Sequence, residues 1–575
     1  MYRKNRRTQQ PLLLSNINEL PERSKKRLAQ SWAEVFRQEV FLGINEDLFA
    51  VLYEGFPSRP NIPVNILMGL EILKGWRNWS DEELYDHFLF DLQVRYALGC
   101  DNFGEDDFDL RTLYYFRHRI SEYALTKGIH LVRKVFEGIT DQQLGKLEVK
   151  TGMQRMDSTM IASQIADLSR LELLIQVLQR LHRILNEADQ VLYADIFQPY
   201  IKENAGQYTY RLKGKEIVWK HIEQVGGVLQ DLLVKLIKDY GEDPIYQVAQ
   251  RFFDENFKLV EAVVQGKTNE EIGAGCLQSL DDLEASFRRK GNRAYKGYAA
   301  NITETCNPDN PVQLITQVQV EPNRTSDIEF MKEGLPMLLE RMQVDTVASD
   351  GGYVGPEIDQ LMRDLKVNHI TTGLTGSLPN HQEGKLALSD FEMKLDQSGE
   401  VIHAVCPAGQ VACVTASIRH KSFKLTFSTP VCQACPFYLQ ALCPIKANRK
   451  RTTFWLRVPR EHANSSQRRR RFERCKAEAR ELRPAVEATI FQIKHAFVRN
   501  KVRVRGLFRV TTVLLCSALA VNLRRIHRYQ NDKQRGKYTS AKKRDVLFPF
   551  LFWVRNTVWL SFGRLPIAFR LCFSW

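Results

Sequence analysis

Three acidic residues stand where carboxylate chemistry could be assembled. Asp157 follows a strand-like stretch, Asp350 follows a later one and precedes two glycines, and Glu487 lies in a helical pattern. Carboxylate and phosphate oxygens are the ligands that Mg²⁺ takes in octahedral geometry. Two such ions about 3.5–4 Å apart can activate a water or a 3′-hydroxyl and stabilise the leaving oxygen of an in-line displacement. The three acids therefore predict metal-dependent phosphoryl transfer without a side-chain nucleophile.

The spacing of residues around Glu487 predicts a helix. An apolar stripe at i, i+4, i+7 and i+11 comprises Val486, Ile490, Ile493 and Phe497. Arg483, Glu487 and Lys494 fall together on an adjacent face. An acid between two cations suits a site that meets a metal and a phosphate backbone, and a surface helix with an i,i+4 Arg–Glu pair is the alternative. Pro484 fits best at a first helical position, so we expect a break or kink there.

The elements that must position the acids follow a familiar order. Residues 149–156 are expected to form a strand that ends at Asp157, and two β-rich runs at 295–303 and 312–320 predict a hairpin. A helix is expected over 328–342, a strand over 345–349 and a helix over 356–365. This order resembles a ribonuclease H-like fold, in which acids at the ends of the first and fourth strands meet and a later helix supplies the third. The predicted fold class is α/β with a mixed sheet.

Changes in pattern divide the chain into regions. Helical periodicity is expected within 24–41, 64–76, 81–98 and 110–135 of a helical N-terminal domain, and five of the eleven cysteines lie within 370–460. The domains that we predict are a helical domain at 1–145, a catalytic core at 146–369 with a helical insertion at 163–290, a Cys-rich β-like insertion at 370–460, the C-terminal helices of the core at 461–530, and a basic, aromatic tail at 531–575.

Positive charge is concentrated in the last quarter of the chain. The 575 residues carry a formal charge of +15, but residues 441–575 hold 32 Lys or Arg and 7 Asp or Glu, and the remainder has a net charge of −10. This asymmetry favours an anionic partner, with nucleic acid first. The arginine run at 468–471 fits either a DNA contact or a solvated helix face. The segment 112–120 (TLYYFRHRI), which contains Arg117 and Arg119, fits either an amphipathic core helix or a helix laid on DNA.

The ordered motifs together resemble the DDE transposases of bacterial insertion sequences that carry a helical insertion-sequence N-terminal domain. The stretches that carry the resemblance are 63–96 with 112–120, 156–159 (MDST), 296–298 with 304–311, 349–353 (SDGGY), 483–494, 503–507 and 518–525 (ALAVNLRR). The resemblance implies a triad of Asp157, Asp350 and Glu487 that holds two Mg²⁺ or Mn²⁺ ions. It implies that double-stranded DNA, at transposon ends and target, is cut and joined at terminal inverted repeats. It further implies an N-terminal domain that reads the repeats and a homodimer or larger assembly on paired ends.

The third motif of such transposases is often written Y-R-E-K, and this chain departs from it at one position. Arg483, Glu487 and Lys494 match the pattern, but Arg480 stands where the Tyr is expected, so a hairpin intermediate is not assumed. The cations that the resemblance places along DNA are Arg483, Lys494, Arg468, Arg469, Arg470, Arg471, Arg503 and Arg505, with Arg117 and Arg119 in the N-terminal domain. A catalytically inactive or decayed copy that only binds DNA, and a nuclease that cuts without joining, remain alternatives.

A cysteine cluster predicts a second kind of metal site. Cys406, the pair Cys432 and Cys435 two residues apart, and Cys443 have the character of ligands for a structural Zn²⁺, and free thiols are the alternative. The basic, polar start carries no secretory signal, and no uncharged apolar stretch reaches transmembrane length. The cysteines are therefore expected to be reduced, in a bacterial cytoplasm, near the nucleoid and without a membrane partner.

Overall fold

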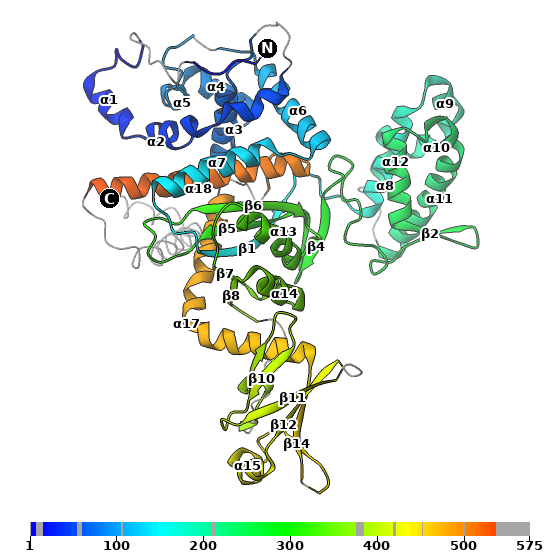
Figure 1. Ribbon diagram of the computed structural model, residues 1–575. Coiled ribbons are helices and arrows are strands. Elements are labelled where there is room, and N and C mark those ends of the chain that lie inside the picture. The colour runs from blue at the N-terminus through cyan, green and yellow to red at the C-terminus, as the bar shows by residue number, and fades with distance from the viewer. Residues whose placement is uncertain are drawn as a thin grey trace, which may run out of the picture.

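The computed structural model describes residues 2–6, 15–53, 60–104, 107–208, 214–374, 384–417, 421–450, 452–495, 497 and 501–535. Most of the predicted tail, from residue 536 onward, lies outside these residues. A central sheet joins three further parts: N-terminal helices above it, a helical domain set to one side, and a small β domain below (Figure 1).

The central sheet is mixed and, among the described residues, has six strands. The strands are β1 (Met153–Ala162), β4 (Ser286–Lys290), β5 (Arg293–Thr305), β6 (Ile315–Pro322), β7 (Thr346–Ser349) and β8 (Asn368–Thr371). β1 is antiparallel to β5 and parallel to β7, and β8 is parallel to β7. The long β5 pairs with β4 through its first half and with β6 through its second. The expected α/β class is therefore confirmed, and β5 and β6 form the expected hairpin.

The first strand does not end where the sequence pattern placed its end. β1 runs to Ala162, and Asp157 lies in its middle. The reason is that β5 pairs with β1 as far as Ala162, whereas β7 pairs with it only from Met153 to Arg155. Asp157 therefore lies just beyond the last β1–β7 pair, although it is still within a strand.

Two helices cover each face of the central sheet. Helices α13 (Asp327–Leu339) and α14 (Pro356–Leu365) bury one face, in a core that contains Phe330 and Ile358. Helices α17 (Arg460–Lys494) and α18 (Leu507–Gln534) pack on the other. Of the break or kink expected at Pro484, the break is wrong, because α17 continues through this residue. Figure 1 shows α17 changing direction on its way from the β domain to the sheet.

The N-terminal helices share one hydrophobic core with α18 and the sheet. They are α1 (Glu22–Ala29), α2 (Trp32–Glu39), α3 (Val64–Arg77), α4 (Asp81–Phe90), α5 (Leu92–Ala97), α6 (Leu110–Lys127) and α7 (Leu131–Lys146), with 3₁₀ turns at Phe41–Gly43 and Glu46–Leu52. The single helices expected over 24–41, 81–98 and 110–135 are each divided, the first by the N-cap Ser31, the second by the N-cap Asp91 and the third by the left-handed Gly128. α18 has the length and mean hydropathy of a membrane-spanning helix, but 72% of its apolar window is buried inside the protein.

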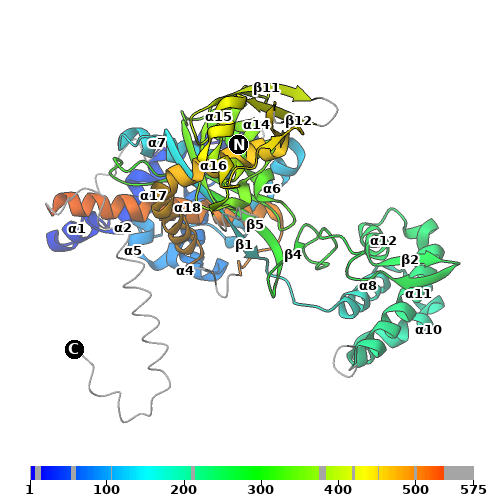
Figure 2. The same cartoon turned by 90° about the horizontal axis from the view of Figure 1, so that it is seen from below.

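The helical insertion forms a separate body with its own core (Figures 1 and 2). It contains α8 (Arg170–Ile184), α9 (Glu187–Leu192), α10 (Ala194–Phe197), the 3₁₀ turns Gln198–Tyr200 and Lys202–Ala205, α11 (Lys215–Tyr240) and α12 (Pro244–Asn256). The expected helical range of 163–290 is too wide. It includes the hairpin β2 (Phe257–Val260) and β3 (Val263–Gly266), and it ends in β4, which belongs to the central sheet.

The Cys-rich region folds as a small β domain with its own core. Its strands are β9 (Glu392–Leu395), β10 (Val401–Val405), β11 (Val411–Ser417), β12 (Ser422–Phe427), β13 (Lys446–Ala447) and β14 (Phe454–Pro459), and two short helices, α15 (Thr429–Ala434) and α16 (Pro436–Leu439), precede β13. Neighbouring strands are antiparallel, in the order β13-β14-β12-β11-β10-β9. The domain passes directly from β14 into α17.

Candidate active site

The structure brings the three predicted acids close enough to influence one another. Asp350 follows β7, and its Oδ1 accepts a hydrogen bond of 2.8 Å from the backbone N–H of Gly352 in the 3₁₀ turn Gly351–Tyr353. Burial, followed by repulsion from Asp350 and Glu487, raises the pKa of Asp157 to about 7. Three carboxylates far apart in the sequence therefore form one electrostatically coupled group.

Glu487 makes the i,i+4 pair that the surface-helix alternative predicted. Its Oε1 accepts a hydrogen bond of 3.0 Å from Arg483 Nε, and both side chains are about half exposed, at 54% and 52%. The same guanidinium lies near Asp350 and Asp157. The hydrogen bond from Arg483 to Glu487 is the main reason that the pKa of Arg483 is raised, and these two acids raise it further. The Arg–Glu pair is thus part of the acidic group.

Lys494, the third member of the predicted motif, links α17 to β1 by hydrogen bonds. Its Nζ donates to the backbone oxygen of Met160 at 2.9 Å and to Thr159 Oγ1 at 3.1 Å. Burial lowers its pKa. Because both acceptors lie on β1 just beyond Asp157, Lys494 holds the end of α17 against the strand that carries the first acid. Its predicted contact with DNA stays a prediction.

A fourth carboxylate, Asp327, was not among the predicted residues. It is the first residue of α13, and its Oδ1 accepts a hydrogen bond of 2.6 Å from Ser158 Oγ. It also contributes to the raised pKa of Asp157. A topological argument could have found it. β6 runs parallel to β1 and β7, so the helix after β6 begins at the same edge of the sheet as Asp350.

A buried ion-pair network lies beside the acids, and the sequence patterns did not predict it. The fully buried Glu304 of β5 pairs with Arg155 Nε and Arg525 NH1, each at 2.7 Å. Both of its oxygens accept a hydrogen bond from Thr489 Oγ1, at 2.9 and 2.8 Å. Arg155 is two residues before Asp157, and Thr489 is two residues after Glu487. The network therefore joins the strand of the first acid to the helix of the third.

Several predicted DNA-binding cations are engaged within the protein. Arg117 is half-buried and pairs with Glu71 and Asp81, each at 2.7 Å, which is the behaviour of a core helix residue. In the arginine run, Arg468 and Arg471 pair with Asp359 at 3.3 and 3.6 Å, and Arg470 pairs with Glu392 at 3.0 Å. Arg469 also has a partner.

The remaining predicted cations are more open to solvent. Arg503 and Arg505 are about half exposed and make ion pairs of 3.5 Å with Glu83 and Asp281. The exposed Arg119 lies over the ring of Tyr53, with 5.0 Å between the guanidinium carbon and the ring centroid. The structure thus leaves Arg119, Arg503 and Arg505 more exposed than Arg468 and Arg470 of the arginine run.

The four predicted zinc ligands are brought together in the β domain. Cys406, Cys432, Cys435 and Cys443 line one small cavity. Burial, followed by the proximity of the other three thiols, raises the pKa of Cys432 to about 11. The turn after β10 places the backbone N–H of Gln410 3.4 Å from Cys406 Sγ, with Gly409 at a φ of +80°.

Neither predicted metal site is preformed. Among the described residues, no group of three or more His, Cys, Asp or Glu side chains is arranged to hold a metal ion. In the acidic group, Glu487 is turned to Arg483 and Asp350 to the backbone of Gly352. In the cysteine cluster, the Cys432 thiol donates to Gln410 Oε1 at 3.5 Å. Binding a metal at either place requires these side chains to exchange partners.

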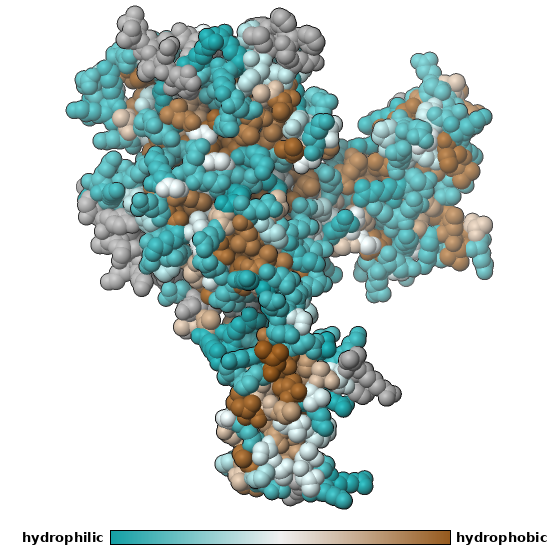
Figure 3. Space-filling model, viewed as in Figure 1, coloured by the Kyte–Doolittle hydropathy of each residue, from teal (hydrophilic) through white to brown (hydrophobic). Residues whose placement is uncertain are grey.

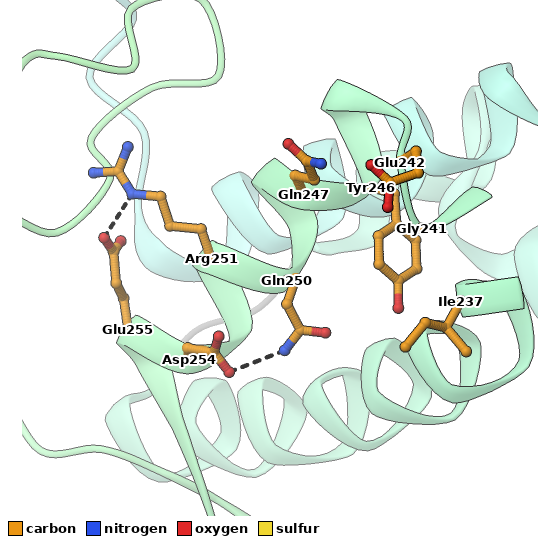
Figure 4. Close-up of a pocket in the computed structure, with 9 residues that line it drawn as sticks. All are labelled: Ile237, Gly241, Glu242, Tyr246, Gln247, Gln250, Arg251, Asp254 and Glu255. Carbon is orange, nitrogen blue, oxygen red and sulfur yellow. Dashed lines mark hydrogen bonds and ion pairs between the residues drawn. The ribbon is translucent and has the colours of Figure 1, made fainter.

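A surface hollow in the helical insertion is separate from the acids (Figure 4). It lies between the end of α11 and the face of α12, and its polar side chains pair with one another. Arg251 Nε donates to Glu255 at 2.8 Å, and Gln250 donates to Asp254 at 3.0 Å. It presents no group of catalytic side chains.

One family comparison matches the C-terminal part of the chain. Residues 405–527 match the family model described as Transposase DDE domain. No curated protein and no solved structure matches the chain significantly. The matched stretch contains the cysteine cluster and Glu487, whereas Asp157 and Asp350 precede it. Residues 405–527 are therefore similar to a transposase DDE domain, in agreement with the DDE transposases of insertion sequences that the chain's motifs resemble.

Proposed function

We propose that this protein is a DNA transposase that cuts and joins the ends of an insertion sequence, with Asp157, Asp350 and Glu487 as its catalytic acids. The observation that carries the proposal is that burial, followed by repulsion from Asp350 and Glu487, raises the pKa of Asp157 to about 7. Repulsion of this kind is typical of sites that assemble carboxylates for function. The match to a transposase DDE domain gives the group its reaction class.

A ribonuclease H-like arrangement of the central sheet supports the proposal. Three antiparallel strands, β6, β5 and β1, are followed by two parallel ones, β7 and β8, and α13 and α14 connect them in the order that the sequence predicted. The first two acids follow neighbouring parallel pairs at the same edge. In open α/β sheets, ligands bind at the carboxyl ends of the strands.

The donor set suits Mg²⁺ or Mn²⁺, because it consists of hard carboxylate oxygens that repel one another. Two such ions, when bound, would activate the attacking oxygen and stabilise the leaving one. The raised pKa of Asp157 favours its protonated form, so Asp157 must lose this proton when the metal binds. Glu487 must leave Arg483, which frees that guanidinium to face a phosphate.

The decisive experiment incubates purified protein and Mg²⁺ with labelled DNA that carries the terminal inverted repeat flanking the reading frame. The wild type is expected to cleave at the repeat end and to join it to target DNA. Asp157→Asn, Asp350→Asn and Glu487→Gln should each abolish both steps. Asn at 350 can still accept the hydrogen bond of Gly352, so that variant should remain folded. Asp364→Asn, an exposed acid on α14, is the matched control and should retain activity.

The outcomes separate the alternatives. Cleavage without joining identifies a nuclease, and binding without cleavage, unchanged in Asp350→Asn, identifies an inactive DNA-binding copy. Either result overturns the proposal. We also expect the N-terminal helices to read the repeat and the active complex to contain two or more copies on paired ends. The mass of the protein–DNA complex in light scattering measures the number of copies.

We further propose that Cys406, Cys432, Cys435 and Cys443 hold a structural Zn²⁺. The support is their position around one cavity and the two-residue spacer between Cys432 and Cys435. A backbone N–H directed at Cys406 would stabilise a thiolate there. Bound Zn²⁺ would relieve the mutual effect that raises the pKa of Cys432.

Metal analysis of two matched variants tests this zinc site. Cys413 lies in the same domain but is exposed on β11, outside the cluster. The wild type and Cys413→Ser should contain one zinc per chain, and Cys435→Ser should lose it. An unchanged zinc content in Cys435→Ser defeats the four-cysteine site.

A further inference from the structure

The outer face of the β domain combines an aromatic ring with several cations. The side chains of Lys424 on β12, Lys446 on β13 and Arg457 on β14 each lie within 6 Å of the Trp455 ring centroid, at 5.9, 5.9 and 5.8 Å. Contacts of this kind hold cations over an aromatic surface. All three charged side chains are exposed. We call Lys424, Lys446, Trp455 and Arg457 the basic face.

Strand register explains why these residues share one surface. Lys424 pairs directly with Arg457, and Trp455 pairs with Thr426 on one side and Lys446 on the other. Successive residues of a strand alternate between faces. The intervening residues Leu425 and Leu456 point into the core of the domain. The basic face is therefore the solvent side of the sheet.

The direct pairing of Lys424 with Arg457 is unfavourable for folding. Like charges directly opposite one another on neighbouring strands destabilise a sheet. Among the described residues, neither side chain forms an ion pair, and the sequence from 401 to 460 holds nine Lys or Arg and no Asp or Glu. The repulsion therefore has no counter-charge within this stretch, and an external polyanion would supply one.

We propose that the basic face binds the phosphate backbone of double-stranded DNA. The inference rests on the proposed function only in its choice of DNA as the polyanion, which a +15 chain with a transposase DDE domain favours. Small polar side chains also lie on this face, since Thr415 of β11 pairs with Lys424 and Thr426 of β12 pairs with Trp455. That composition suits phosphate and sugar contacts, which position DNA without reading its sequence.

Continuity with α17 gives the basic face a defined distance from the acids. β14 ends at Pro459 and α17 begins at Arg460, so Glu487 lies 27 residues along one helix. At 1.5 Å per residue this part of the helix spans at most about 40 Å, and the three residues from Arg457 to Arg460 add at most about 10 Å. DNA bound on the basic face at Arg457 would thus be held within about one and a half turns of B-DNA of the reacting phosphate.

The test measures binding of the full chain to a non-specific duplex by fluorescence anisotropy over a range of salt. The triple variant Lys424→Gln, Lys446→Gln, Arg457→Gln should lower the slope of log K against log salt by about 2–3, and should lower the affinity at 0.1 M salt by at least about tenfold. The matched control replaces three exposed lysines of α11, Lys220, Lys235 and Lys238, by Gln and should bind as the wild type does.

Stability separates a binding role from a structural one. Because the triple variant removes the Lys424–Arg457 repulsion, its melting temperature should not fall. Lys424→Glu creates an attractive cross-strand pair, so it should melt no lower than the wild type and still lose affinity. Two results would overturn the inference. The first is that both variants bind DNA with the affinity and salt slope of the wild type. The second is that the variants bind DNA normally but lose binding to anionic phospholipid vesicles.

Activity distinguishes this inference from the proposed function. Asp350→Asn should bind the non-specific duplex with the wild-type slope even though it does not cleave. If the chain binds DNA through the basic face and never cleaves, only the proposed reaction fails. If it cleaves and the triple variant binds normally, only the inference fails.

Discussion

Replacement of Glu304 by Gln is expected to weaken both the fold and the alignment of the catalytic acids. The carboxylate of Glu304 accepts from three donors, Arg155, Arg525 and Thr489. An amide has the same shape, but it is neutral and turns one acceptor oxygen into an N–H₂ donor that faces other donors. The variant therefore leaves two guanidinium groups near an uncharged partner.

The magnitude follows from the burial of the network. Glu304 is fully buried, and the side chains of Arg155 and Arg525 are only 10% and 17% exposed. Removing one partner of such a buried pair costs about 3–5 kcal/mol. At about 2 °C per kcal/mol for a large folded unit, the melting temperature should fall by about 6–10 °C.

Thermal unfolding of wild type, Glu304→Gln and Glu357→Gln gives the comparison. Glu357 pairs with Lys332 at 2.6 Å on the surface, so the same chemical change there should not shift the melting temperature measurably. Equal shifts in the two variants would refute the reasoning. Cleavage by Glu304→Gln, assayed well below its melting temperature, should also fall, because Arg155 and Thr489 flank the acids.

The pH dependence of this difference has a definite sign. Burial raises the pKa of Glu304, but Arg155 and Arg525 outweigh it and hold the pKa below its ordinary value of 4.5. A depressed folded pKa contributes stability that is present at neutral pH and is lost as pH falls through that pKa. The difference in melting temperature between wild type and Glu304→Gln should therefore become smaller below pH 4.5. A difference that does not change with pH would argue against an ion pair.

Three further predictions use other features of the structure. Because burial and repulsion raise the pKa of Asp157 to about 7, the affinity for Mg²⁺ measured by calorimetry should rise about tenfold from pH 6 to pH 8, and binding at pH 6 should release a proton. An affinity that is the same at both pH values would mean that Asp157 is not a ligand. Gly297→Ala, at a φ of +139°, would bring a Cβ to 2.5 Å from the backbone oxygen of Ile161 and should lower the melting temperature, whereas Gly138→Ala in the open face of α7 should raise it slightly. Burial lowers the pKa of His130 to about 4, so the contribution of His130 to stability should decline as pH falls from 6.5 toward 4; the difference in melting temperature between wild type and His130→Gln should change in that direction over this range, and a constant difference would contradict the prediction.

Much of the fold could be predicted from the sequence because its signals are local. The alternation in β5 and β6 and the Pro at the start of α14 act over a few residues, and these elements appear where they were expected. The end of β1 was missed because it depends on how far the partner β5 extends, which β1 itself does not encode. The continuity of α17 through Pro484 was missed for a similar reason: an isolated helix is expected to break there, but packing against the sheet holds this one.

The candidate site shows the same division. Asp157, Asp350 and Glu487 were recognised by motif, and the structure couples them electrostatically. Glu304 was passed over as a functional residue because its partners, Arg155 and Arg525, are 149 and 221 residues away. No spacing rule connects such positions. Asp327, by contrast, could have been predicted, since the strand directions alone place the start of α13 at the edge of the sheet where the acids meet.

Helix α17 unites these features, since one continuous element carries the third acid, the network and the link to the basic face. Thr489 is bound to Glu304 and Lys494 to β1, so the end of the helix near the acids is fixed to the sheet at two points. Its other end continues directly from β14, which carries Trp455 and Arg457. The side chain of Glu487 is not fixed in this way, because among the described residues its hydrogen bond is the exposed one from Arg483. Of the three acids, Glu487 is thus the one whose side chain most easily changes partner, since Asp157 lies within a strand and the carboxylate of Asp350 is held by the backbone N–H of Gly352.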